Sequence, residues 1–290
     1  MEKLTTICDF LRLALTKFNQ EDLYYGHGTD NAWDDAILLV LGILKLPIDI
    51  NPMLMNAKLT KEETIKVING IEKRAKDRVP VPYITNEAWF ARMPFYVDER
   101  VLIPRSPIAE LIENHFNPWV NLEINSILEL CTGSGCISIA TAKELPHVKI
   151  DATDISSDAL DVAKINVKKH NLQDNIELIK SDIFKNLQNK KYDLIVTNPP
   201  YVDKEDMDSL PNEFHHEPKL GLEAGDDGLL LATEIIQNAK QHLNAGGALI
   251  VEVGNSADAL MDKFPNLPFT WVEFEKGGSG VFVLQYDELP

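Results

Sequence analysis

The four residues Asn198-Pro199-Pro200-Tyr201 have the types and the order needed to hold a flat group that carries an NH₂. The Asn198 side-chain oxygen and the Pro199 carbonyl can each accept one hydrogen bond from such a group. Tyr201 offers a ring face on which the flat group can stack. A rigid turn after a core strand would explain the same four residues, because prolines punctuate turns. The tetrapeptide alone leaves both interpretations open.

The residues just before this motif indicate where it lies in the fold. Leu194, Ile195 and Val196 form an apolar run typical of a strand that is buried on both faces in a parallel sheet. Neither proline can donate a backbone hydrogen bond, so the strand must end at the motif. We therefore expect the motif at the carboxyl edge of a parallel sheet, where open α/β proteins bind their ligands.

A glycine turn is predicted between the first strand and the first helix of the same region. Gly133 and Gly135 allow a tight turn and the close approach of a ligand to the backbone. Ser138 stands where a dinucleotide-binding motif would have its third glycine, and no phosphate-binding lysine follows, which argues against a nucleoside triphosphatase. The full segment is Glu129-Leu130-Cys131-Thr132-Gly133-Ser134-Gly135-Cys136.

Two aspartates, Asp154 and Asp182, follow the second and third predicted strands. Asp154 could accept hydrogen bonds from both hydroxyls of a ribose. Asp182 could accept one from an adenine amino group, the Ile183 amide could donate to a ring nitrogen, and Phe184 could cover the ring. Each aspartate alone also suits a helix cap. Together, at successive strand ends beside the glycine turn, they predict an adenosine site.

The elements that must position these residues alternate between strand and helix from residue 127 onward, which predicts a parallel sheet with right-handed crossovers. A glycine-rich link with no helix joins the last two strands, so these two should be antiparallel and at the end of the sheet. The predicted strands are 127–130, 149–153, 176–180, 192–197, 248–253, 269–274 and 281–285, and the predicted helices are 136–145, 159–170, 228–242 and 257–264.

The first part of the chain has a helical pattern instead. Residues 5–76 predict three or four packed helices, one of them after an N-cap at Asp30 and another after a capping box at Thr60. The predicted apolar stripes include Trp33 and Ile68. Residues 79–83 read as a stiff linker and 86–103 as a hairpin that includes 101–103. Ser106 should then cap a helix whose first residue is Pro107, and Arg105 reads as a surface cation.

Composition limits the classes of function. With 290 residues and a formal net charge of −17, a broad basic surface for nucleic-acid phosphates is not expected, whereas a basic protein partner would suit the charge. The 3 cysteines lack the spacing of a zinc site or a disulfide framework, and no metal site is predicted. The chain begins without the pattern of a signal peptide, and its longest apolar stretch, 36–44, is too short to span a bilayer, so we expect a cytoplasmic protein.

Taken together, these motifs resemble the class I methyltransferases that use S-adenosyl-L-methionine, with a seven-stranded Rossmann-like sheet. Asn198 to Tyr201 resemble the motif of those members that methylate a planar NH₂. The helical N-terminus, the hairpin and the Val101-Leu102-Ile103-Pro104-Arg105 segment narrow the likeness to the protein-(glutamine-N(5)) methyltransferases (HemK/PrmB-like). The segments that resemble the branch acting on large-subunit (50S) ribosomal protein three are 87–90, 95–100, 105–107, 130–136 and 212–218.

The resemblance implies S-adenosyl-L-methionine as the cofactor and a glutamine side chain of a ribosomal protein as the acceptor. Residues 1–78 should recognise the substrate, because the 79–83 linker separates them from the cofactor motifs; an interface role is the alternative. Residues 79–107 should connect, and 108–290 should bind the cofactor and transfer the methyl group. The release-factor branch and a nucleic-acid adenine methyltransferase are the alternatives, and a non-enzymatic cofactor binder is a third. The implied acceptor residues are Asn198, Pro199, Pro200 and Tyr201, and the implied cofactor residues are Glu129, Thr132, Gly133, Ser134, Gly135, Asp154, Asp182, Ile183, Phe184 and Asn198.

Overall fold

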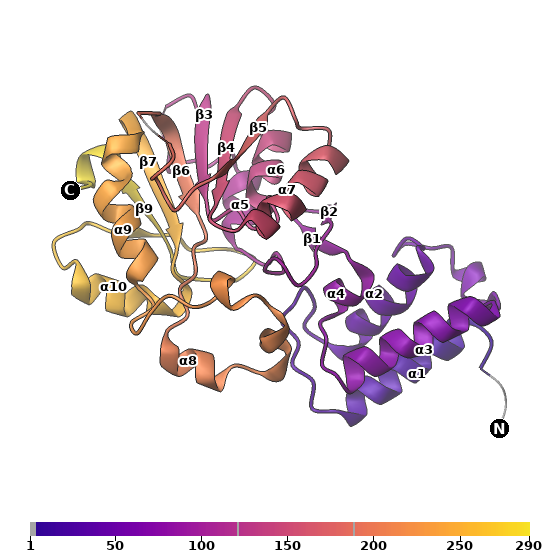
Figure 1. Cartoon of the computed structure of the whole chain (residues 1–290). Coiled ribbons are helices and arrows are strands. Elements are labelled where there is room, and N and C mark those ends of the chain that lie inside the picture. The colour runs from indigo at the N-terminus through magenta and orange to yellow at the C-terminus, as the bar shows by residue number, and fades with distance from the viewer. Residues whose placement is uncertain (1–3, 121, 188) are drawn as a thin grey trace. The chain divides into compact units, whose positions relative to one another are not determined.

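The computed structural model describes residues 4–120, 122–187 and 189–290, which form two compact units. The first unit runs up to Ala88 and also takes in Val97–Glu99 and Pro211–His216; the second consists of Trp89–Tyr96, Arg100–Leu210 and Glu217–Pro290. Figure 1 shows the elements of each unit. The division of roles among 1–78, 79–107 and 108–290 stays a prediction.

The first unit is a small helical bundle, as the sequence predicts. Its helices are α1 (Ile7–Gln20), α2 (Ala32–Leu44), α3 (Lys61–Ala75) and the short α4 (Val81–Thr85), with a 3-10 turn at Pro52–Asn56. The capping box at Thr60 is confirmed: its hydroxyl accepts from the Glu63 amide, and the Glu63 carboxylate accepts from the Thr60 amide. The box satisfies backbone donors that the first helical turn leaves open.

Several local predictions for this part of the chain were wrong. Asn31, not Asp30, caps α2. Residues 79–83 are not an extended linker, because α4 begins at Val81 with Pro82 in its first turn, where a missing N–H costs nothing. Trp33 and Ile68 are 49% and 38% exposed, so they are not part of the buried stripes.

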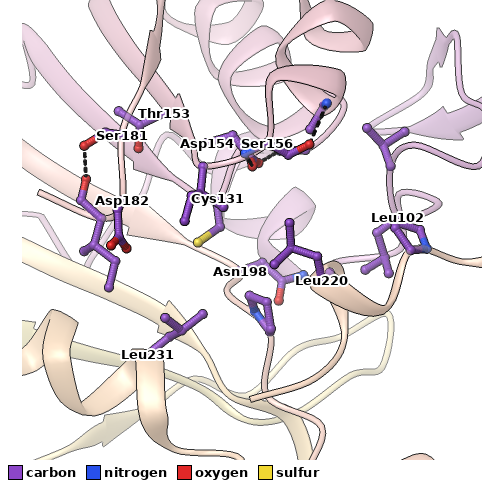
Figure 2. Close-up of a pocket in the computed structure, with 18 of the residues that line it drawn as sticks. Leu102, Cys131, Thr153, Asp154, Ser156, Ser181, Asp182, Asn198, Leu220 and Leu231 are labelled. Atoms are coloured by element: carbon purple, nitrogen blue, oxygen red, sulfur yellow. Dashed lines mark hydrogen bonds between the residues drawn. The ribbon is translucent and has the colours of Figure 1, made fainter. Parts of the chain in front are cut away.

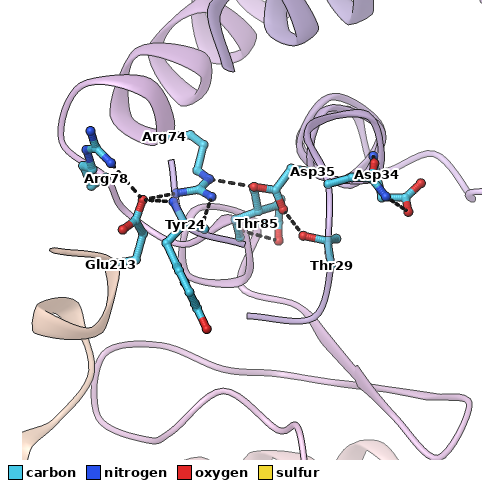
Figure 3. A network of polar contacts seen from close by, with 10 residues as sticks. Tyr24, Thr29, Asp34, Asp35, Arg74, Arg78, Thr85 and Glu213 are labelled. Carbon is cyan, nitrogen blue, oxygen red and sulfur yellow. Dashed lines mark hydrogen bonds and ion pairs between the residues drawn. The ribbon is translucent and has the colours of Figure 1, made fainter. Parts of the chain in front are cut away.

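A buried network of charges ties three segments of the first unit together (Figure 3). Arg74 on α3 donates to Asp35 on α2 (2.7 Å), to the Tyr24 carbonyl (2.8 Å) and to Glu213 (3.2 Å). The Tyr24 amide also donates to Glu213, at 3.0 Å. The three charged side chains are almost completely excluded from solvent. Glu213 thereby fastens residues 211–216 to helices that precede them by more than a hundred positions.

The second unit contains the predicted α/β sheet, whose strand order is β5-β4-β3-β6-β7-β9-β8. Neighbouring strands from β5 to β7 are parallel, and β9 is antiparallel to both β7 and β8, which confirms the predicted antiparallel end of the sheet. The strands are β3 (Ser126–Leu130), β4 (Lys149–Asp154), β5 (Ile176–Lys180), β6 (Tyr192–Thr197), β7 (Leu243–Glu252), β8 (Thr270–Trp271) and β9 (Val281–Gln285).

Helices cover both faces of this sheet, which explains the apolar runs along its strands (Figure 1). Leu194 and Val196 of β6 belong to one buried cluster and Ile195 to the other, since successive side chains point to opposite faces. α5, α6 and α7 pack on the first face, and α9 and α10 on the second. Their bounds are α5 (Ile108–Glu113), α6 (Cys136–Glu144), α7 (Ser157–Lys169), α9 (Leu230–Ala239) and α10 (Ala257–Lys263); α8 (Lys204–Ser209) follows β6.

The segment before the sheet differs from its prediction. A hairpin forms, but its strands are only β1 (Ala88–Phe90) and β2 (Met93–Phe95). Residues 101–103 are not a strand, because the Ile103 amide donates to the Glu217 carboxylate (3.0 Å) instead of to a neighbouring strand. α5 begins at Ile108, one residue later than predicted, with the Ser106 hydroxyl accepting from the Ile108 amide.

Candidate active site

The carboxyl ends of β3, β4, β5 and β6 open into one cavity of the second unit (Figure 2). β3 is followed in sequence by its neighbour on one side, β4, while β6 lies on its other side, so the cavity lies where the strand order reverses. Ligands of open α/β sheets bind at that position. The cavity contains about 910 Å³ free of protein atoms, including its open mouth, which is room for a ligand the size of a nucleoside derivative.

The glycine turn contributes Gly133 to the lining of the cavity, whereas Gly135 is not among the lining residues. Gly133 has a φ of +53° and no heavy atom within 4 Å of the position that a Cβ would take, so its backbone faces open space. Gly135 has a φ of +79° and lies directly before α6, where it acts as the helix N-cap. Gly133 lines the cavity as predicted, and Cys131, which the sequence did not single out, lines it too.

Glu129, Thr132 and Ser134 lie behind this turn and are buried. The Glu129 carboxylate accepts from the Thr132 hydroxyl (2.6 Å) and from the amide (3.0 Å) and hydroxyl of Ser138. Burial raises the pKa of Glu129 to about 7, although these donors oppose the shift. Within the described part of the chain, none of the three lines the cavity. Glu129 instead stabilises the turn from behind, through its bonds to Thr132 and Ser138.

Asp154, at the end of β4, lines the cavity beside the glycine turn. One carboxylate oxygen accepts from the Gly133 amide and the other from the Ser156 amide, both at 2.9 Å. A carboxylate has about four lone-pair positions, so Asp154 keeps acceptor capacity for a ligand. Burial raises the pKa of Asp154, while the amide donors hold it down. Asp154 is therefore a fixed acceptor turned toward the cavity.

Asp182 and Ile183 line the same cavity at the end of β5. The Asp182 carboxylate forms an ion pair with Lys185 at 2.5 Å, and Ile183 has a φ of +46°. Phe184 does not line the cavity: its ring stacks on His242, with 4.6 Å between the ring centroids. The structure thus brings Asp182 and Ile183 to the predicted place and leaves Phe184 outside it.

Asn198 and Pro200 line the cavity at the end of β6. In Figure 2 Asn198 lies with Leu220 on one side of the cavity, and Asp154 with Ser156 lies on the other. Among the described residues, no hydrogen-bond partner is found for the Asn198 side chain or the Pro199 carbonyl. The Asn198 side chain is therefore open to a ligand that carries an NH₂, whereas Pro199 is buried and neither it nor Tyr201 is among the residues that line the cavity.

Tyr201 is held by a residue that the sequence reasoning missed. Its hydroxyl donates to Glu252, the last residue of β7, at 3.2 Å, and the other Glu252 oxygen accepts from the Ser106 hydroxyl at 2.5 Å. Burial raises the pKa of Tyr201 and that of Glu252, so the phenol stays protonated and can donate. The sequence could have indicated this role for Glu252, because adjacent parallel strands end at the same edge of a sheet and Glu252 ends the strand next to β6.

Arg105 is not the surface cation that its position in the sequence suggested. It forms two hydrogen bonds to the Glu217 carboxylate, at 2.6 and 2.8 Å, and that carboxylate is fully buried. Glu217 also accepts from the Ile103 amide. These bonds hold Ile103 and Arg105 to Glu217, and the segments next to them, residues 100–102 and 218–221, both contribute lining to the cavity.

The groups that line the cavity fit S-adenosyl-L-methionine. Gly133 leaves open space where a side chain would intrude, Asp154 offers a fixed carboxylate to ribose hydroxyls, and Asp182 with Ile183 offers a polar edge to adenine.

The helices in the described part of the chain include none with the length and hydropathy of a membrane-spanning segment.

Replacing Asp154 by alanine is expected to weaken binding of S-adenosyl-L-methionine by roughly 1–3 kcal/mol, since hydrogen bonds to a charged group are lost. Titration calorimetry on the folded variant measures this. As a control, Asp158→Ala removes an exposed carboxylate from the first turn of α7 and should leave the affinity unchanged. Equal affinity of the Asp154 variant and the wild type would rule out the ribose contact.

Comparison with known proteins places the chain among methyltransferases. The family model "Methyltransferase small domain" matches residues 110–225. A curated protein of Francisella tularensis subsp. tularensis, named ribosomal protein uL3 glutamine methyltransferase, is 51% identical, over 100% of this chain and 93% of its own length. A protein of Neisseria gonorrhoeae with the same name is 46% identical, over 99% of this chain and 97% of its own length.

A solved structure supports the same fold at low sequence identity. The hMettl16 catalytic domain, in complex with a MAT2A 3′UTR hairpin, superposes with a TM-score of 0.52 at 18% identity, over 83% of this chain and 88% of that chain. At this level the likeness concerns the fold alone. Of the two branches considered from the sequence, both curated relatives carry the name of the ribosomal one.

Proposed function

The chain belongs to the family of ribosomal protein uL3 glutamine methyltransferases, and we propose that it methylates the side-chain amide of a glutamine in uL3, with S-adenosyl-L-methionine as the methyl donor. The observation that carries this proposal is Asn198, which lines the cofactor cavity and whose side chain has no hydrogen-bond partner among the described residues. A glutamine amide has an NH₂ with two hydrogens, for which we propose the Asn198 oxygen and the adjacent Pro199 carbonyl as acceptors.

The residues of the chain would act mainly by orientation. The Asn198 oxygen and the Pro199 carbonyl would accept the two amide hydrogens, fixing the plane of the acceptor and leaving electron density on its nitrogen. Bound S-adenosyl-L-methionine supplies an electrophilic methyl group. Because direct transfer needs the nitrogen aligned with that group, holding the amide in one orientation accounts for much of the rate. Asp154, Gly133 and Asp182 would hold the cofactor at the opposite side of the cavity.

The charge of the chain supports a basic substrate segment. The net charge of −17 would attract a positively charged protein and repel nucleic-acid phosphates. We propose that uL3 offers such a segment, that residues 1–78 contribute to its recognition, and that the reaction takes place in the cytoplasm without direct binding of nucleic acid.

The direct test uses the purified chain, methyl-labelled S-adenosyl-L-methionine, and purified uL3, release factor and RNA in separate reactions. We expect the label in uL3 alone, and fragmentation of the labelled protein should place the added methyl on a glutamine. Label in the release factor instead would move the chain to the other branch of substrates. Absence of label from uL3, with the cofactor bound, would reject the proposed substrate.

A further inference from the structure

A turn that begins at the last residue of β7, residues 252–256, contacts Tyr201 of the acceptor motif. At one end of the turn, Glu252 accepts a hydrogen bond from the Tyr201 hydroxyl (3.2 Å). At the other end, the Ser256 hydroxyl donates to the Tyr201 carbonyl (3.0 Å). The side chain and the backbone of Tyr201 are therefore held by the same five-residue turn, which we call the 252–256 turn.

Gly254 lies between these two contacts, and the ring of Tyr201 packs directly on it. A Cβ at Gly254 would lie 2.5 Å from one ring carbon and 2.9 Å from another, closer than real Cβ contacts. Gly254 also has a φ of +48°, a conformation that side-chain-bearing residues rarely adopt. Only glycine lets the ring rest in this position.

Other contacts make the 252–256 turn rigid. The second carboxylate oxygen of Glu252 accepts from the Ser106 hydroxyl (2.5 Å), and Glu252 is buried. The Val253 amide donates to the Gly280 carbonyl (2.7 Å), which connects the turn to the residue before β9. Gly280 has a φ of +73°, and a Cβ there would lie 2.2 Å from the Gly254 carbonyl oxygen. The turn is thus anchored on both sides and cannot shift independently of the sheet.

We infer that the 252–256 turn is a positioning device for the acceptor site, in which Glu252 and Gly254 act through Tyr201 to fix the ring on which the glutamine amide lies. This inference rests on the proposed function, because it assigns Tyr201 to the acceptor. Neither Glu252 nor Gly254 lines the cofactor cavity within the described part of the chain, so their effect should fall on transfer and spare cofactor binding.

The decisive variant is Gly254→Ala, with Gly277→Ala as its matched control. Gly277 has a φ of +87° but no heavy atom within 4 Å of the position that a Cβ would take, so the control carries the backbone strain without displacing a ring. For Gly254→Ala we expect single-turnover transfer to uL3 to fall by about 10-fold or more, since alignment is lost, while cofactor affinity stays within about twofold. Gly277→Ala should match the wild type in both measurements.

A double-mutant comparison separates action through Tyr201 from general loss of structure. In a Tyr201→Ala background the ring is gone, so adding Gly254→Ala should slow transfer no further; the same holds for adding Glu252→Gln in a Tyr201→Phe background. The conservative Tyr201→Phe keeps the ring on Gly254 and should lose less activity than Tyr201→Ala.

The outcomes distinguish the inference from the proposed function. If the wild type does not label uL3, the proposed function fails, whatever the variants do. If the wild type is active and Gly254→Ala transfers normally, or if its effect adds in full to that of Tyr201→Ala, the inference is overturned. A fall in cofactor affinity equal to the fall in transfer would also overturn it, because the turn would then serve the cofactor site.

Discussion

Asn198→Ala is expected to bind S-adenosyl-L-methionine almost normally and to transfer its methyl group about 10²-fold more slowly or worse, because alignment of the reacting atoms supplies much of the rate. Asn198 lines one side of the cavity, and its side chain makes no hydrogen bond that stabilises the fold among the described residues. The variant should therefore fold, and its loss should concern the acceptor. Calorimetry with the cofactor and single-turnover labelling of uL3 measure the two effects separately.

Two further variants sharpen this test. Asn198→Asp keeps an acceptor but adds a negative charge near a cationic methyl donor, which favours the ground state over a transition state whose charge is dispersing; it should bind the cofactor and transfer poorly. Asn125→Ala removes an exposed side-chain amide at the opposite edge of the sheet that donates to the nearby Glu123 carbonyl, and it should change neither quantity. Near-normal transfer by Asn198→Ala would contradict the proposal that Asn198 holds the acceptor amide.

The sheet and the cofactor side of the cavity could be predicted because their signals are local. Leu194 to Val196 predict a strand buried on both faces, and Asp154, Asp182 and Asn198 each stand at or within two residues of a strand end. Once the strands are parallel, their ends must share one edge, so the cavity follows from the order of elements. The position of the Phe184 ring could not be predicted in this way, because it stacks on His242 from a distant segment.

The remaining features depend on long-range pairing, which no local pattern reports. Arg105 is 112 positions from its partner Glu217, and the Ser106 hydroxyl is 146 positions from Glu252. In each case a buried carboxylate, Glu217 or Glu252, accepts a hydrogen bond from the loop that contains Arg105 and Ser106. The predicted strand at 101–103 does not form for the same reason: the Ile103 amide donates to the distant Glu217 carboxylate.

The largest effect on stability is expected for Arg74→Met in the helical unit. The guanidinium lies between the buried carboxylates of Asp35 and Glu213. Removing it leaves Asp35 buried without a cation among the described residues and leaves Glu213 with the longer ion pair to Arg78, at 3.5 Å (Figure 3). Breaking a buried ion pair in this way costs about 3–5 kcal/mol. We expect α1, α2 and α3 to lose protection of their amides, while the sheet of the second unit keeps its own.

Hydrogen exchange followed by mass spectrometry resolves these two regions, and titration with S-adenosyl-L-methionine reports on the second unit. If residues 1–78 help to recognise uL3, transfer to uL3 should fall in Arg74→Met although the cofactor still binds. Arg92→Met is the matched control, since Arg92 is exposed and lies 3.5 Å from Glu113, and exposed pairs contribute little to stability.

A second variant separates loss of the cation from loss of packing. Neutralising the partners as well, in Arg74→Met combined with Asp35→Asn and Glu213→Gln, removes the uncompensated charges and should restore much of the protection, because the penalty lies in leaving charges buried and alone. Unchanged protection of α1 to α3 in Arg74→Met would contradict the assigned role of the network. Loss in the triple variant equal to that in Arg74→Met would show that packing around the long arginine side chain, and not its charge, holds residues 211–216 to the helices.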